Sequence, residues 1–374
     1  MMRGFSFYRW LGILIKEFIQ LKRDRLTFGM IVGIPMIQLL LFGFAINSDP
    51  KHLPTAVVMA DPGPFARSYV AALQNSRYFR LIGSVGEREA DRLLDRGEAQ
   101  FIVTFPAGFH RALVRGQSPP LLVEADATDP MATGGAISVL NRLGVEVFAP
   151  DLPGFKLPAA PPFELRVHRR YNPEGITAYN VVPGLSGVIL TMTMILMTGL
   201  AMTRERERGT FENLLATPAT PFEVMTGKIV PYILIGLIQV TLILLAARWI
   251  FEVPMQGSLA LLYAVVLLFI CANLILGITF SSIARNQLQA MQMTFFFFLP
   301  SILLSGFMFP FRGMPEWAQA LGSVLPLTHF LILVRGILLK GNGLELLWGH
   351  IWPILLFMVA VLALGLKTFR KTLD

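Results

Sequence analysis

The chain contains a single cysteine, Cys271, among its 374 residues, and this cysteine lies within an apolar segment. One cysteine can form neither a disulfide within the chain nor a cysteine-based metal site. The five histidines show no metal-ligand spacing, so no bound metal is expected. These absences exclude a disulfide-stapled scaffold and a zinc-binding module.

Charged residues are also scarce. They make up 15% of the chain, while 54% of residues are hydrophobic and the mean hydropathy is +0.60. Soluble domains usually carry about 25% charged residues. The composition therefore predicts an integral membrane protein.

Motifs of catalysis and nucleotide binding are missing as well. Neither a HExxH zinc motif nor a GxSxG nucleophile elbow occurs. The pair Gly227-Lys228 resembles the end of a phosphate-binding loop. However, Phe222 stands where that loop needs glycine, and Ile229 where it needs serine or threonine. No catalytic residue and no cofactor are expected on this chain, so ATP that drives it would be hydrolysed by another subunit.

The apolar segments after residue 176 lack Asp, Glu, Lys and Arg well inside them, and Arg248 and Arg285 lie at segment edges. Proton- and ion-coupled carriers usually place ionisable groups near the middle of the membrane. This absence argues against a secondary transporter and against an intramembrane protease.

The net charge of +8 is unevenly distributed. Between Asn47 and Thr177, fourteen Lys/Arg balance fourteen Asp/Glu, whereas the positive excess lies near the ends of apolar segments. Such a distribution follows the positive-inside rule and predicts that both termini are cytoplasmic. The positive charge thus encodes orientation in a membrane, and no nucleic-acid partner is expected.

The predicted fold class is an α-helical polytopic membrane protein with six transmembrane helices and an inserted extracytoplasmic α/β domain. Residues 1–26 are interpreted as a cytoplasmic amphipathic interfacial helix, with a charged flank of the first span as the alternative. Residues 27–46 are expected to form the first span, and residues 47–176 the extracytoplasmic α/β domain. Region 177–374 contains the other five spans, which are expected at 178–202, 229–248, 258–283, 288–309 and 349–367. Each approaches the roughly 20 residues that cross a bilayer.

Within 47–176, strand and helix patterns alternate. Such alternation favours an α/β layer with a partly parallel sheet. Strands are expected at 55–60, 79–83, 100–105, 121–126 and 163–170, and helices at 64–75, 87–96, 107–115 and 129–148.

Residues 311–345 are apolar but too interrupted by proline and glycine to form one span. We expect short helices that dip into the outer leaflet as a re-entrant segment, where irregular backbone must be buried by protein. The residues that mark this segment are Pro310, Pro315, Trp317, Pro326 and His329.

The cytoplasmic loop 203–228 carries charges of both signs between two apolar segments. Helix-breaking residues within it indicate a structured element at the membrane surface, where the membrane part would contact a soluble partner. The residues expected to make that contact are Glu205, Glu207, Arg208, Gly209, Thr210, Glu212, Gly227 and Lys228.

Methionine, aromatic and polar residues crowd the second and fifth spans. Flexible methionines and rings suit an adaptable apolar surface, and polar side chains can hydrogen-bond between helices. The functional interpretation is a path for an amphipathic or lipid-like substrate; the alternative is lipid-facing or helix-packing residues. The candidates are Thr191, Met194, Met197, Gln292, Phe295 and Phe296.

The charged loop resembles a known family. Glu207-Arg208-Gly209-Thr210-Phe211-Glu212-Asn213-Leu214-Leu215, followed by Thr217-Pro218 and Gly227-Lys228, is similar to the cytoplasmic-loop signature of ABC-2 type permeases, the membrane subunits of ATP-binding-cassette exporters. A second similarity lies before the last span, in Phe309-Pro310, Met314-Pro315, Leu325-Pro326-Leu327-Thr328-His329 and Arg335-Gly336. The overall layout resembles the bacterial branch with a large periplasmic domain.

The resemblance implies a permease in the bacterial inner membrane that moves a drug or lipid-like substrate outward. It implies two permease subunits, identical or paralogous, and two ATPase subunits that bind ATP and Mg. A periplasmic adaptor protein is a further implied partner, and membrane lipid surrounds the spans. Glu207 and Glu212 would contact the ATPase, with Gly209 allowing a sharp turn. The alternative is a membrane-anchored sensor or adaptor whose external domain binds a ligand or a protein.

Overall fold

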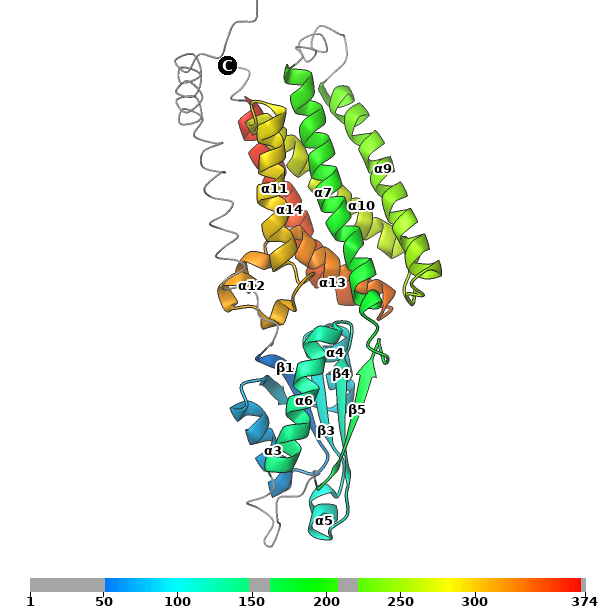
Figure 1. The fold of residues 1–374 in the computed structure, drawn as a ribbon, viewed down its shortest axis with the longest axis vertical. Helices are drawn as coiled ribbons and strands as arrows, with labels where there is room; N and C mark the ends of the chain where they lie inside the picture. Colours follow the sequence, from blue (N-terminus) through cyan, green and yellow to red (C-terminus); the bar gives the residue numbers. More distant parts are fainter. Residues whose placement is uncertain (1–50, 148–161, 208–220, 371–374) are drawn as a thin grey trace, which may run out of the picture.

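The computed structural model of the chain describes residues 51–147, 162–207 and 221–370. These residues form a sheet domain and a bundle of long helices, which stack along the longest axis of the molecule (Figure 1). The interfacial helix expected at 1–26 and the span expected at 27–46 lie outside the described residues.

The sheet has five strands in the order β2-β1-β3-β4-β5. Only β3 and β4 are antiparallel; the other three neighbouring pairs are parallel, so the expectation of a partly parallel sheet is confirmed. The strands are β1 Leu53–Met59, β2 Phe79–Ser84, β3 Phe101–Phe105, β4 Pro120–Asp126 and β5 Glu164–Arg170, within two residues of the expected bounds.

Helices cover both faces of the sheet. The residues of β3 alternate: Phe101 and Val103 pack into a core with α3, α5 and α6, whereas Ile102 packs against α4 on the opposite face. This division follows from the two-residue period of a strand. The helices are α3 Pro64–Asn75, α4 Glu87–Asp95, α5 Phe109–Val114 and α6 Pro130–Glu146.

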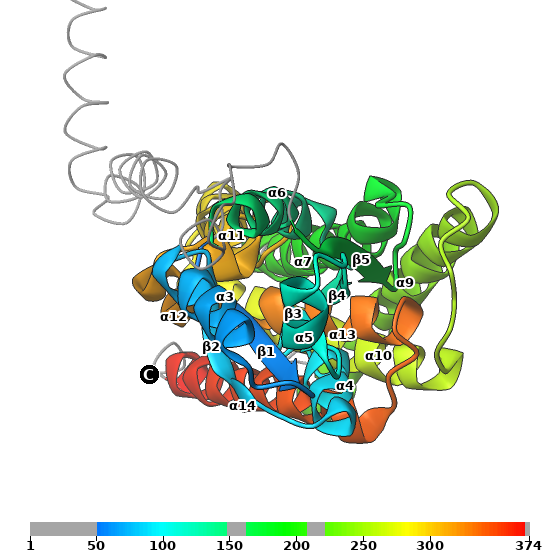
Figure 2. The ribbon, with the colours of Figure 1, turned by 90° about the horizontal axis from the view of Figure 1, so that it is seen from below.

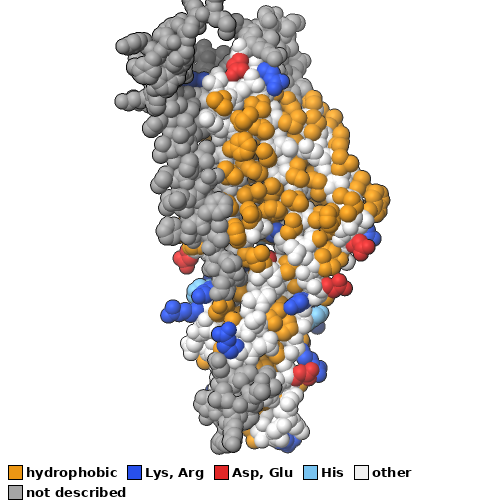
Figure 3. All heavy atoms as spheres, viewed as in Figure 1, with side chains coloured by type: hydrophobic (Ala, Val, Ile, Leu, Met, Phe, Trp, Pro, Cys, Tyr) orange, Lys and Arg blue, Asp and Glu red, His pale blue; other side chains and the backbone are white. Residues whose placement is uncertain are grey.

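The second part of the molecule is built from long helices: α7 Thr177–Glu207, α9 Pro221–Trp249, α10 Leu259–Ile283, α11 Gln287–Leu304 and α14 Leu344–Arg370. Among the described residues these five are long and apolar enough to cross a membrane. Hydrophobic side chains cover this part of the surface broadly, while charged side chains concentrate beyond it (Figure 3). The expected span 288–309 is too long at its end, because the helix stops at Leu304 and Gly306 turns the chain with φ +82°.

Helix α10 lies at the centre of this bundle and packs against α7, α9, α11, α13 and α14. It is apolar on all sides, as expected for a helix that has protein or lipid around it. Phe269 of α10 stacks on Phe330, with ring centroids 4.0 Å apart. Close contact with α7 depends on Gly277, since a Cβ there would lie 1.9 Å from Thr198 Oγ1.

Three short elements follow α11, as expected for residues 311–345: η2 Phe311–Gly313, α12 Glu316–Gly322 and α13 Pro326–Leu338. Helices α12 and α13 meet at a bend of 83°, and only the two together are long and apolar enough to cross a membrane. The described residues therefore hold five candidate spans, or six if this bent pair counts as one.

The sheet domain joins the bundle through a short, fixed connection between β5 and α7. Asn172 in this connection is fully buried, and its side chain both accepts from Ile176 N at 2.9 Å and donates to Ile176 O at 3.0 Å. Seen from below, the sheet domain overlaps the helices (Figure 2), so the two parts are stacked end to end along the long axis of Figure 1. The C-terminal end of β4 faces the connection between α13 and α14, where Asp126 bonds to Lys340.

Candidate functional site

At one end of the bundle, Glu207 ties α7 to α11. Its Oε1 accepts from the backbone N–H of Gln287 at 2.8 Å, and its Oε2 accepts from Gln287 Nε2 at 2.5 Å. Gln287 is the first residue of α11, where backbone N–H groups lack partners and the helix dipole favours negative charge. These bonds from Gln287 lower the pKa of the exposed Glu207 carboxyl. Of the predicted contact residues, Glu207 is therefore engaged within its own chain.

The other predicted contact residues are distributed over two helices and an undescribed segment. Arg208, Gly209, Thr210 and Glu212 lie outside the described residues. Glu205 lies in α7, and Gly227 and Lys228 lie in α9. The expected loop 203–228 is thus too long, because α7 continues to Glu207 and α9 already begins at Pro221. Pro at the first helical position fits, since its missing N–H would be unpaired there in any case. The coupling role stays a prediction.

The candidate substrate-path residues fall into two environments. Thr191 and Met194 of α7 are fully buried inside the chain, and Phe295 packs against the same core that holds Met194. Met197 and Gln292 are partly exposed, and Phe296 is exposed. The structure therefore does not bring the six onto one surface, and their role in a path stays a prediction.

The residues that mark the interrupted segment begin its short helices. Pro310 precedes η2, Pro315 precedes α12, and Pro326 is the first residue of α13. Each thus fits the preference of proline for helix starts. Trp317 on α12 is exposed, whereas His329 on α13 is buried. Their depth in a membrane stays a prediction.

His329 lies against a second histidine, His350 of α14. The Nδ1 atoms of the two rings are 3.1 Å apart, and His329 Nε2 is 2.8 Å from Ser323 O. A carbonyl oxygen only accepts, so His329 Nε2 carries a proton. In the neutral ring its Nδ1 then accepts from His350 Nδ1, which leaves His350 Nε2 as an acceptor. His350 also lines a cavity at the junction with the sheet domain.

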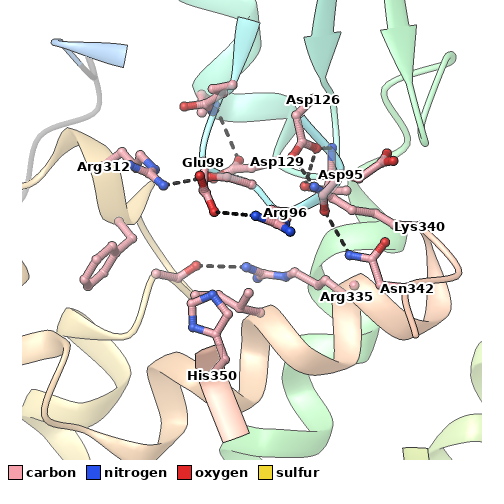
Figure 4. A pocket seen from close by; sticks show the side chains of 18 of the residues that line it. Asp95, Arg96, Glu98, Asp126, Asp129, Arg312, Arg335, Lys340, Asn342 and His350 are labelled. Atoms are coloured by element: carbon pink, nitrogen blue, oxygen red, sulfur yellow. Dashed lines mark hydrogen bonds and ion pairs between the residues drawn. The ribbon is translucent and has the colours of Figure 1, made fainter. Parts of the chain in front are cut away.

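This junction cavity has a volume of about 390 Å³ and lies where the sheet domain meets η2, α13 and α14 (Figure 4). Its polar lining comes from both parts of the molecule. The charged members are Asp95, Arg96, Glu98, Asp126, Asp129, Arg312, Arg335 and Lys340. Apolar residues of the bundle complete the wall, among them Phe311, Ile332 and Leu347.

The connection between α13 and α14 docks on the sheet domain beside this cavity. Lys340 Nζ bonds to Asp126 Oδ2 at 2.5 Å and to Leu94 O at 3.0 Å. Asn342 Nδ2 donates to Asp95 O at 2.9 Å. The side chains of Lys340 and Asp126 are only 8% and 10% exposed. A buried, directly paired charge of this kind fixes the two parts against each other.

The remaining inward carboxylates also have protein partners. Asp129 caps α6, accepting from Met131 N at 3.1 Å and from Ala132 N at 3.4 Å. Asp95 accepts from the Tyr171 hydroxyl at 2.5 Å. Burial, followed by that bond to Asp95, raises the pKa of Tyr171 well above its usual range. The phenol therefore stays a hydrogen-bond donor.

The junction is the site that analysis of the sequence missed. In the sequence, Arg335 stands within a family motif and Asp126 at the end of an expected strand, while Lys340 belongs to no motif. One signal was present: Arg312, Arg335 and Lys340 lie in or next to apolar runs with few nearby acids. Because buried cations need partners, such residues indicate a contact with a distant segment.

We expect Asp129→Asn to change the pH dependence of stability. Burial raises the pKa of the Asp129 carboxyl above its usual value of about 4. The folded chain then binds more protons than the unfolded chain, so the free energy of unfolding falls as pH rises through this range. Asparagine still caps the helix but does not titrate. Unfolding measured at several pH values should show the variant gaining on the wild type as pH rises, and a pH-independent difference would contradict this.

Comparison with known proteins identifies the chain as a whole. The family model described as "ABC-2 family transporter protein" matches residues 25–367. The probable multidrug ABC transporter permease YbhR of Escherichia coli K12 is 30% identical over 366 residues, covering 98% of this chain and 99% of the relative.

The chain belongs to the ABC-2 family of transporter proteins. YbhS of the same organism, also named a probable multidrug ABC transporter permease, is 29% identical over 372 residues, covering 98% of this chain and 97% of the relative. The inner membrane transport permease YhhJ of Escherichia coli K12 is 33% identical over 351 residues, covering 90% of this chain and 93% of the relative. The resemblance read from the charged loop is thereby confirmed.

Membership in the ABC-2 family settles the class of protein. The chain is a membrane permease subunit of the ABC type, and its apolar helices make it a multi-pass membrane protein. Permease subunits of this family lack an ATPase of their own, so the family implies ATPase partner subunits.

Proposed function

We propose that this ABC-2 permease exports an amphipathic or hydrophobic molecule, drug or lipid-like, from the cytoplasm or the inner leaflet, powered by separate ATPase subunits that bind ATP and Mg. The observation that carries this proposal is the match along nearly the whole chain to permeases named as multidrug transporters. The absence of Asp, Glu, Lys and Arg from the interior of the expected spans supports it, because an ion-coupled carrier would place ionisable groups there.

The proposed arrangement has six spans in the bacterial inner membrane, formed by residues 27–46 and the five long helices. Both termini are cytoplasmic and the domain 47–176 is periplasmic. The distribution of charge supports this orientation, since the domain is neutral and the positive excess lies at span ends. A second permease subunit, identical or paralogous, and a periplasmic adaptor complete the assembly.

The contact between Glu207 and Gln287 gives this proposal a route for coupling. The segment after α7 would lie on the ATPase, with Glu212 as a contact. Charge pairs at the edge of a protein–protein interface fix how the two surfaces are aligned. Glu207 joins the end of α7 to the start of α11, two helices that also pack together. Movement of the loop would therefore displace both helices together.

The test is gentle purification from the native membrane, followed by assay of the accompanying ATPase activity and of export. We expect a stoichiometric ATPase subunit to co-purify. Glu212→Ala should lower substrate-stimulated turnover and export about tenfold, the loss of one charge-assisted contact. The control is Glu89→Gln, because Glu89 is exposed on α4 of the sheet domain. Recovery of the chain without an ATPase, or unchanged export by Glu212→Ala, would contradict the proposal.

A further inference from the structure

The junction cavity contains two arginines with a different set of partners from its carboxylates. Arg312 Nη2 donates to Gly97 O at 2.7 Å. Arg335 donates to Asn180 Oδ1 at 2.9 Å, to Asn180 O at 3.4 Å and to Gly306 O at 3.3 Å. All of these acceptors are neutral. Within the described parts of the chain, neither guanidinium has a carboxylate at ion-pair distance.

The inward carboxylates, in contrast, are already occupied. Asp126 is paired with Lys340, Asp129 caps α6, and Asp95 accepts from Tyr171. Arg96 and Glu98 have side chains that are about half exposed, and Arg96 Nη1 lies 3.8 Å from Glu98 Oε1. Each arginine retains N–H groups beyond those it uses, because a guanidinium carries five donors. The uncommitted capacity of the cavity is therefore cationic.

The surroundings of Arg312 support the same conclusion. Burial and the nearby Arg80 lower the pKa of its guanidinium below the usual range, and the attraction of the Asp126 and Glu98 carboxylates offsets this only in part. An anion that accepts hydrogen bonds from the N–H groups of such a partly buried guanidinium also offsets its positive charge, and therefore stabilises it. The planar fork of arginine suits phosphate and carboxylate groups in particular.

The cavity also offers acceptors and apolar walls. Gln100 Oε1 is buried without a hydrogen-bond partner, and His350 Nε2 is left as an acceptor by the histidine pair. Ile332, Leu346 and Leu347 from the bundle line the opposite wall. A ligand that satisfies the site therefore combines an anionic group, a hydroxyl or amine donor, and an apolar portion.

We infer that the junction cavity binds the anionic head group of an amphiphile, with Arg312 and Arg335 holding the anion and Gln100 accepting from a neighbouring donor. Phospholipid head groups have this chemistry, and free phosphate shares only its anionic part. The inference concerns binding at the junction and does not depend on the direction or energy source of transport.

The test measures binding to the purified full chain in a neutral detergent by native mass spectrometry. The probes are dioctanoyl phosphatidylglycerol, the uncharged dioctanoylglycerol with the same chains, and inorganic phosphate. We expect phosphatidylglycerol to bind at least about tenfold more tightly than either other probe, as the loss of a charge-assisted contact would require. If the uncharged lipid binds equally well, the cavity does not recognise an anionic group. If phosphate binds equally well, the cavity does not recognise an amphiphile.

Variants locate the binding. Arg312→Gln should weaken phosphatidylglycerol about tenfold, whereas Arg312→Lys, which keeps the charge without the fork, should weaken it less. Arg115→Gln is the matched control, because Arg115 is exposed beside α5 at the far end of the sheet domain (Figure 1). Arg335 also bonds to α7, so Arg335→Gln is interpreted only if its unfolding midpoint matches that of wild type. An unchanged affinity in Arg312→Gln would place the lipid elsewhere and overturn the inference.

Discussion

Lys340→Met should lower the free energy of unfolding by about 3–5 kcal/mol, the usual cost of leaving one partner of a buried ion pair alone. The partner is Asp126, whose side chain is 10% exposed. Methionine has a similar volume but no charge, so the packing of the connection between α13 and α14 is largely kept. The loss also includes the bond to Leu94 O and the contact of Nζ with the Tyr171 ring, 4.9 Å from its centroid.

The measurement is denaturant unfolding of the purified chain, with limited proteolysis reporting on the junction. Lys367→Met is the control, since Lys367 is exposed on α14. The double variant Lys340→Met with Asp126→Asn removes both charges while keeping an acceptor for Thr128. It should recover a substantial part of the loss, because neither member of this pair is then left as a lone buried charge. A single variant as stable as the control would show that Lys340 does not hold the two parts together.

The same pair shows what the sequence could and could not predict. The positions of the strands follow from a local period of two, and those of the long helices from hydropathy. The sequence therefore predicts both, with small errors at the ends of the elements. Lys340 and Asp126 are separated by 214 residues, and no local pattern connects them. Their contact depends on how the connection after α13 meets the ends of β4 and α4, which is a property of the folded chain.

Helix ends and the candidate site show the same limit. The early end of α11 depends on the positive φ of Gly306, one glycine among 32 in the chain. The interaction of Glu207 with Gln287 was not predicted, because a charged loop indicates contact with some partner but not which one. Arg335 was visible as part of a motif, yet its role at the junction required the position of Asn180 on α7.

A second large effect is expected at the centre of the bundle, where Gly277→Ala should destabilise the chain by about 1–3 kcal/mol or more, the usual cost of overpacking. The new Cβ would lie 1.9 Å from Thr198 Oγ1 and 2.8 Å from Ile195 O. Rotation of Thr198 can relieve the first contact but would give up its 2.6 Å bond to Met194 O. The second contact is with backbone, so α7 and α10 must separate, and small residues at such crossings are what permits close approach.

Gly349→Ala provides the matched control, because Gly349 is also helical but nothing lies within 4 Å of its added Cβ. This substitution should leave the stability unchanged or raise it slightly, since alanine has a higher helix propensity than glycine. Thermal unfolding in one detergent compares the two. Adding Thr198→Ala to Gly277→Ala removes the hydroxyl contact but not the one with Ile195 O, so we expect partial recovery. Equal stability of both glycine variants would mean that α7 and α10 can separate without cost, and full recovery would mean that the hydroxyl, not the backbone, sets their distance.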